Sequence, residues 1–159
     1  MSIFPTRILL ATDGSREAEL AARTAADLSQ KTNSELHVVH VFGIAPVGPP
    51  VYPEGIDLQS VEFEAESDER QRISERRARE VLEAEVEKIR SGGGTVAGEH
   101  LLEGRVAPEI VGLAEEIGAG LIVMGSRGSG GIRRALMGSV SDSVVRHAHC
   151  PVMVAREEE

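Results

Sequence analysis

The sequence has few aromatic residues, a single cysteine and no long hydrophobic run. Aromatic side chains make up 3% of the chain and tryptophan is absent, so its core must consist of Val, Ile, Leu and Ala, as in helix-covered parallel sheets. One cysteine excludes an internal disulfide framework and is typical of a reducing compartment. No apolar run reaches the length of a membrane span, and no apolar stretch follows a basic amino terminus. We therefore expect a soluble, cytoplasmic protein.

Positive charge is also scarce. The chain has 17 Lys and Arg against 26 Asp and Glu, a net charge of −9, which argues against general nucleic-acid binding and against docking on an anionic membrane. Its 159 residues, 41% of them hydrophobic and 27% charged, suffice for one globular core. We expect a single domain over residues 1–159.

Short apolar segments alternate with helical patterns along the chain. Such alternation predicts parallel βαβ units with helices on both faces of the sheet. A proline-rich loop is expected at residues 43–57. The expected strands are residues 7–12, 36–42, 95–102, 121–124 and 151–155. The expected helices run from an N-cap at Ser15 to Asn33, from about 59 to 90, from 108 to 117 and from 139 to 149.

The segment 59–90 carries the highest density of charge. Its second half keeps one apolar stripe at helical spacing, while Glu and Arg alternate around it. The stripe weakens before about Arg72, and we expect that first half to fray. The charged side is interpreted as a solvated face or a partner surface. The stripe consists of Ala78, Leu82, Val86 and Ile89.

Three segments with turn or glycine chemistry follow predicted strands directly. They are residues 12–14, 41–43 and 125–128. In parallel sheets, ligands bind at the carboxyl ends of the strands, at the point where the strand order reverses. We expect the three segments to converge on one site.

The third of these segments opens a spaced glycine motif. Gly125, Gly128 and Gly138 followed by Ser139 have the spacing G-x2-G-x9-G-S, after an apolar run and before a helical pattern. Glycines let backbone N–H groups approach a phosphate, and a helix N-terminus adds unpaired donors and a positive dipole end. The motif predicts an anion site.

Two better-known phosphate motifs do not fit this segment. A P-loop starting at Gly125 has Gly131 where lysine is required, and a dinucleotide fingerprint starting at Gly128 has Arg133 at its third glycine. The sequence therefore does not support a P-loop NTPase or a dinucleotide-dependent enzyme.

The same stretch also has an interpretation that needs no bound ligand. Ser139 to Asp142 fits an S-x-x-D capping box, which stabilises a helix start by itself. Four arginines against Asp142 form a basic stretch that suits a triphosphate, or part of it merely keeps a loop tip soluble. These arginines are Arg127, Arg133, Arg134 and Arg146.

Four stretches together resemble the universal stress protein family, in its ATP-binding branch. They are residues 9–15, 123–128, 138–141 and 149–154, and the resemblance covers nearly the whole chain. It implies an open, parallel, five-stranded sheet with helices on both faces, Rossmann-like, with strand order 3-2-1-4-5. It also implies a homodimer through the last strand, Val152–Ala155, since a short apolar edge strand invites pairing.

The resemblance also implies a nucleotide site. Asp13 would contact the ribose or a Mg²⁺ on the phosphates, Val41 would offer backbone contacts to adenine, and Met124 would pack on the base. From the residues alone, a second interpretation of Asp13 is a turn former, and Val41 and Met124 are plain core. The complete set is Ala11, Thr12, Asp13, Val41, Met124, Gly125, Arg127, Gly128, Gly138, Ser139, Val140 and Ser141.

The function expected from this resemblance is a regulatory ATP-binding module. A slow ATPase or self-phosphorylating enzyme, with Ser139 or Ser141 as acceptor, is the main alternative, although no general base or motif lysine is recognisable. A dimeric scaffold that binds AMP, a cyclic nucleotide or nothing is a third reading. Residues 147–150 contain two histidines and a cysteine without a second ligand pair, so no structural metal is expected. His40 is a weaker site candidate at a strand end.

Overall fold

The computed structural model describes residues 2–43, 58–126 and 138–157, with the backbone alone for 58–67. All strand pairs are parallel, in the order β3-β2-β1-β4-β5, as predicted. The strands are β1 (Arg7–Ala11), β2 (Glu35–Phe42), β3 (Gly98–Glu103), β4 (Ala119–Gly125) and β5 (Val152–Ala155). The helices are α1 (Arg16–Thr32), α2 (Leu58–Ser91), α3 (Val106–Ile117) and α4 (Ser139–His147).

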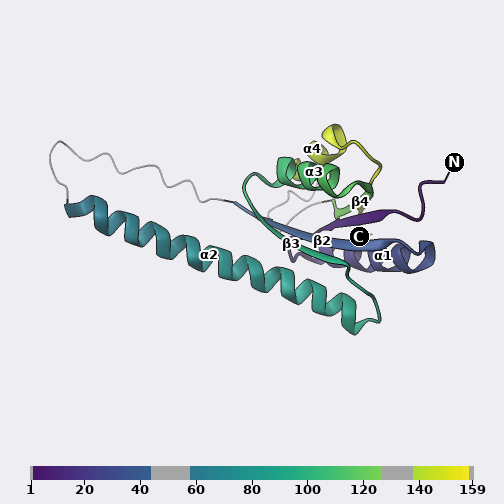
Figure 1. The fold of residues 1–159 in the computed structure, drawn as a ribbon, viewed down its shortest axis with the longest axis horizontal. Coiled ribbons are helices and arrows are strands. Elements are labelled where there is room, and N and C mark those ends of the chain that lie inside the picture. Colours follow the sequence, from purple (N-terminus) through teal and green to yellow (C-terminus); the bar gives the residue numbers. More distant parts are fainter. Residues whose placement is uncertain (1, 44–57, 127–137, 158–159) are drawn as a thin grey trace.

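Helices cover both faces of the sheet, α1 and α2 one face and α3 and α4 the other (Figure 1). Successive strand residues point to opposite faces, so Leu10 joins the core under α1 and α2 while Leu9 joins the core under α3 and α4. Both side chains are fully buried. The two cores consist of aliphatic residues and Ala, as the scarcity of aromatic side chains predicts.

Helix α1 has the ends and the packing face that its sequence predicts. The Ser15 hydroxyl accepts a hydrogen bond from the Ala18 N–H at 3.2 Å, which caps the first turn. Asn33 ends the helix in the left-handed conformation, with φ 55° and ψ 41°. Ala21 and Ala25 are fully buried and let the helix lie close to the sheet.

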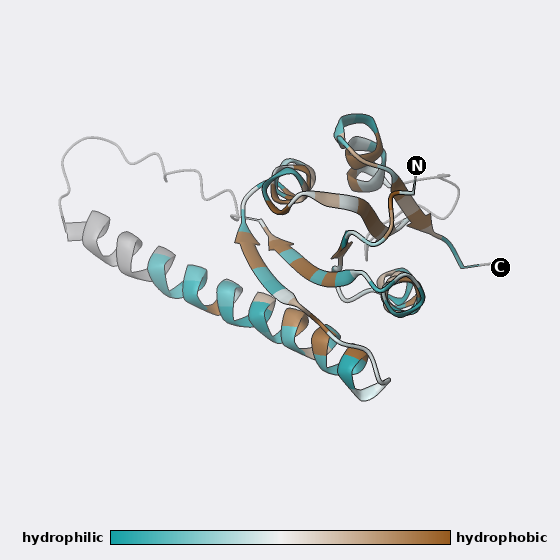
Figure 2. Ribbon diagram, turned by 45° about the vertical axis from the view of Figure 1, so that its right-hand side comes forward, coloured by the Kyte–Doolittle hydropathy of each residue, from teal (hydrophilic) through white to brown (hydrophobic). Residues whose placement is uncertain are grey.

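Helix α2 extends well beyond the sheet (Figure 1). Its apolar stripe lies in the second half, where Leu82, Val86 and Ile89 join the core as predicted, and the side facing water is hydrophilic (Figure 2). The backbone is helical from Leu58 onward, so the expectation that the first half frays is wrong. Glu, Arg and Gln are strong helix formers, and they favour the helix in this half of the segment.

Several boundaries differ from the expected ones by two or three residues. Strand β3 begins at Gly98 rather than at residue 95. Strand β4 begins at Ala119, directly after the left-handed Gly118 that ends α3. Helix α4 ends at His147 because Ala148 is extended, with φ −65° and ψ 143°. Most of the expected loop 43–57 lies outside the described residues. No helix in the described part of the chain is long and apolar enough to cross a membrane.

Candidate functional site at the sheet switch point

The carboxyl ends of β1, β2 and β4 meet at one edge of the sheet. Strand β1 lies between β2 and β4, so chain connections leave it in opposite directions. This is the switch point at which parallel sheets bind ligands. The segments predicted to converge follow these three strands, as far as they lie in the described residues.

The turn after β1 is held by local hydrogen bonds. An oxygen of the Asp13 carboxylate accepts from the Ser15 N–H at 2.9 Å, and the Thr12 hydroxyl oxygen accepts from the Gly14 N–H at 3.2 Å. Gly14 has φ +78°, which favours glycine. Asp13 is therefore the turn former that one reading proposed, and its exposed carboxylate faces solvent at the switch point.

The end of β4 lies close to the start of α1. A Cβ atom added at Gly125 would lie 3.1 Å from the Glu17 Cβ and 3.2 Å from the Ala18 nitrogen. Such distances are shorter than ordinary van der Waals contacts. Gly125 therefore has a packing reason to be glycine that needs no ligand.

Ser126, the residue after β4, connects four elements. Its N–H donates to the Ala155 carbonyl of β5 at 2.9 Å, and its hydroxyl donates to the Glu17 carboxylate of α1 at 2.8 Å. Its carbonyl accepts from the Gly138 N–H at 2.6 Å and from the Ser141 hydroxyl at 2.7 Å. The side chain is completely buried. These bonds bring together the two ends of the glycine segment, residues 126 and 138.

Helix α4 begins at that junction. Gly138 is its N-cap, with φ −72° and ψ 165°, and among the residues that the structure describes no side chain caps the helix. The capping box from Ser139 to Asp142 is therefore wrong, because Ser139 is already the first helical residue. Ser139 is exposed, whereas Ser141 is 2% exposed and donates within the protein.

The apolar members of the predicted set belong to the core. Ala11, Val41 and Met124 are buried among the residues that α3 and α4 cover. Val140 is half-buried and packs against the same core. All four therefore lie near the carboxyl ends of the strands, and their side chains pack in the core.

The predicted basic stretch is described only at its end. Arg127, Gly128, Arg133 and Arg134 lie outside the described residues. Arg146, on the last turn of α4, forms an ion pair with Asp142 at 3.0 Å. Arg146 is thus far along the helix from the N-terminus that would face a phosphate.

Two residues of this region were missed by sequence reasoning. Ser126 follows β4 and lies within the segment 125–128 that was expected to converge on the site, but it was not assigned a role there. Glu17 lies in the first turn of α1 and was likewise not assigned to the site. His40, a weaker candidate, lies beside the site, with its Nδ1 2.7 Å from the Thr12 carbonyl oxygen. His147 contacts the Ser143 carbonyl at 2.8 Å. Among the described side chains, no group of three or more His, Cys, Asp or Glu could hold a metal ion.

The fold defines a doubly wound α/β protein, a class in which ligands bind at the strand reversal. The profile of the universal stress protein family matches residues 5–156, and the chain belongs to that family. A universal stress protein of Methanocaldococcus jannaschii is 35% identical over 152 residues, which cover 95% of this chain and 82% of that protein.

Solved structures show the same architecture. The universal stress protein UspA from Lactobacillus plantarum superposes with a TM-score of 0.79 at 21% identity, covering 96% of this chain and 99% of the other. A universal stress protein from Archaeoglobus fulgidus, solved in complex with dAMP, has a TM-score of 0.60 at 28% identity, covering 98% of this chain and 100% of its own. These likenesses agree with the observed strand order.

Proposed function

We propose that this protein is an ATP-binding regulatory module of the stress response. The observation that carries the proposal is the hydrogen bond from the Gly138 N–H to the Ser126 carbonyl, 2.6 Å long. It joins the ends of the glycine segment at the switch point, directly before a helix whose N-terminus is capped by no side chain of the described residues. Backbone N–H groups in that position suit phosphate oxygens. The dAMP complex of the Archaeoglobus fulgidus relative supports an adenine nucleotide.

The residues divide into those that face a ligand and those that shape the site. Asp13 and Ser139 are exposed and available to contact the sugar and the phosphates. Ser141 and Ser126 instead hold the start of α4 in place through buried hydrogen bonds. Met124 and Val41 form the apolar core beneath the site, because their side chains are buried and only their backbone remains for a ligand.

A Mg²⁺ ion would be bound mainly by the nucleotide. Asp13 fits as its protein contact, because carboxylate oxygens are preferred Mg²⁺ ligands and one oxygen of Asp13 already orients the group through Ser15. Magnesium usually keeps several waters and binds through one or two carboxylates plus phosphates. The ion would supply charge neutralisation on the phosphates.

Titration calorimetry with Mg-ATP tests the proposal, with Gly138→Val as the variant. Gly138 has an extended backbone that valine adopts readily, so the variant should fold and lose binding by crowding the phosphate position. Gly112→Val, in the middle of α3 with open space around it, is the matched control and should bind as the parent does. Absence of heat at millimolar nucleotide for the parent would refute ATP binding. Mass spectrometry of nucleotide released from fresh protein identifies the bound species.

Slow ATP hydrolysis or self-phosphorylation is the second candidate. Exposure favours Ser139 over the buried Ser141 as the phosphate acceptor. Multiple turnovers that disappear in Asp13→Ala would establish an enzyme. Preferential binding of AMP or a cyclic nucleotide in the same titration would favour the scaffold reading instead.

We further propose a homodimer formed through β5, and a cytoplasmic location. Strand β5 is an edge of the sheet, and Met153 is 37% exposed there. An exposed apolar edge strand presents unpaired backbone groups to a second chain. The location rests on the single cysteine, which is typical of a reducing compartment.

A further inference from the structure

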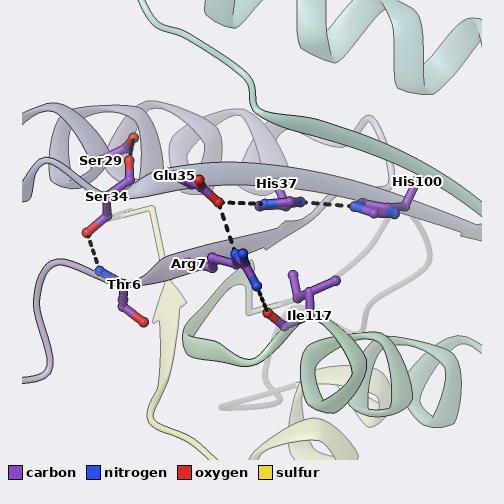
Figure 3. Close-up of polar contacts among 8 residues, drawn as sticks. All are labelled: Thr6, Arg7, Ser29, Ser34, Glu35, His37, His100 and Ile117. Carbon is purple, nitrogen blue, oxygen red and sulfur yellow. Dashed lines mark hydrogen bonds and ion pairs between the residues drawn. The ribbon is translucent and has the colours of Figure 1, made fainter.

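A chain of polar contacts crosses the amino ends of three strands, on the opposite edge of the sheet from the switch point (Figure 3). The Arg7 Nε lies 3.0 Å from the Glu35 carboxylate, and the same carboxylate lies 3.5 Å from the His37 Nε2. The His37 Nδ1 lies 3.1 Å from the His100 Nε2. Arg7 also donates to the Ile117 carbonyl at the end of α3, at 2.8 Å. This series of polar contacts thus joins β1, β2 and β3 to the end of α3.

The two imidazole rings lie end to end. Their centroids are 5.4 Å apart and their planes differ by 22°. With facing nitrogens only 3.1 Å apart, this centroid separation is close to the largest possible, so the rings share one axis, as Figure 3 shows. Such an arrangement is that of an in-line hydrogen bond between ring nitrogens. Two histidines that bind one metal ion would instead direct the lone pairs of their ring nitrogens toward a common point.

Gly98 provides the space for this pair. Gly98 is the β3 partner of His37 in the strand register, and a Cβ atom at that position would collide with the His37 Nδ1. Any other residue would displace the imidazole from His100. The sequence therefore contains a glycine where the contact between the histidines requires one.

The space between the facing nitrogens holds one proton. The carboxylate of Glu35 favours a proton on the His37 Nε2, which leaves Nδ1 to accept from the His100 Nε2–H. If both rings were charged, each facing nitrogen would carry a hydrogen. The contact would then oppose two donors and two positive charges at hydrogen-bond distance.

The surroundings do little to compensate a second charge. Burial lowers the pKa of His100, and the charge of His37 lowers it further, while Glu116 of α3 acts in the opposite direction. Glu35 already pairs with Arg7 of β1. On the other face of β3, Glu99 pairs with Arg90 of α2 at 3.5 Å. Protonation of both rings therefore opposes the close contact of β2 and β3.

We propose that His37 and His100 form a proton-sensitive latch between the amino ends of β2 and β3. The latch is closed when one proton lies between the facing nitrogens and opens when the pair takes up a second one. The sign follows from the lowered pKa of His100: the unfolded chain binds more protons on acidification, so the stability that the pair contributes is lost as pH falls. The latch is independent of nucleotide binding at the opposite edge.

Amide hydrogen exchange of residues 98–101, corrected for intrinsic rates, tests the latch at pH 7.5 and at pH 5. In the parent protein the protection of these amides should fall at least about tenfold at pH 5, while the amides of β1 stay protected. His100→Gln, which cannot charge, should keep its protection at both pH values. His149→Gln, which removes an exposed histidine elsewhere, is the matched control and should behave like the parent.

Equal loss of protection in His100→Gln and in the parent would overturn the proposal. If His100→Gln fails to fold, His37→Gln serves in its place, because it removes the other imidazole of the pair and should likewise keep its protection at both pH values. Imidazole NMR titration of the parent is a further measure that needs no variant. A coupled pair should bind its two protons in separate steps, and two independent, identical titrations would also overturn the proposal.

Discussion

At the residue scale, Glu85 is an acidic side chain buried in the core. It is 2% exposed, and its Oε1 has no hydrogen-bond partner among the described residues. It lines a groove of about 420 Å³ between α1 and α2, beside Ala22, Ala26 and Ile89. Burial raises the pKa of the Glu85 carboxyl above its ordinary 4.5; Lys88 opposes this rise, and Glu19 and Asp13 add to it. A neutral carboxyl is thus favoured in the core.

Glu85→Gln should therefore stabilise the protein in a pH-dependent way. The native state holds the Glu85 proton to a higher pH than the unfolded chain does, so the stability linked to Glu85 is full below 4.5 and is lost as pH rises through the raised pKa. Glutamine cannot ionise, so the free energy of unfolding of the variant should exceed that of the parent most at pH 8. Urea unfolding at pH 4.5 and pH 8 measures this difference. Glu83→Gln, an exposed change on the same helix, should show no such trend, and a difference independent of pH would contradict the account.

At the element scale, the contact between β4 and the first turn of α1 depends on Gly125. Gly125→Ala would place a methyl group 3.1 Å from the backbone carbon and the Cβ of Glu17. The helix start cannot yield easily, because Ser126 also bonds to Glu17. We expect a loss of about 1–3 kcal/mol in the free energy of unfolding, measured in urea.

Gly112→Ala is the control for that substitution. Gly112 lies within α3, and apart from the backbone of its own helix no atom of the described residues lies within 4 Å of an added Cβ. Alanine is the better helix former by about 1 kcal/mol, so this variant should be neutral or more stable. If both variants behaved alike, Gly125 would have no packing role.

The elements that were predicted well are those with a strong local pattern. Buried apolar runs and the alanine face of α1 are visible in the sequence, because periodicity and burial coincide there. The N-cap of α4 was not predictable, because Gly138 and Ser139 both suit a helix start and only the bond from Gly138 to Ser126 decides between them. The same holds for His37 and His100, which are 63 residues apart in the sequence and meet only through the strand register. Non-local contacts of this kind leave no periodic signal.

At the scale of the whole molecule, the two edges of the sheet differ. Strand β3 is flanked by α2, which runs along that side (Figure 1), whereas β5 is the other edge. The last residue of β5 accepts the Ser126 N–H at 2.9 Å. The edge that would pair with a second chain is therefore hydrogen-bonded to the first residue after β4, at the proposed nucleotide site.

A single backbone donor can test whether β5 forms the dimer. The carbonyls of Pro151 and Ala155 accept from the β4 side, at 3.0 and 2.9 Å, and successive residues of a strand direct their polar groups to opposite sides. The N–H of Val154 therefore points away from β4. Val154→Pro removes that donor without breaking the ladder to β4, so the protein should stay folded and become a monomer in sedimentation equilibrium. Val154→Thr keeps the donor and the β-branched shape, and should remain dimeric. A parent protein that is monomeric at high concentration would refute the homodimer. A Val154→Pro variant that still dimerises would place the dimer contact elsewhere.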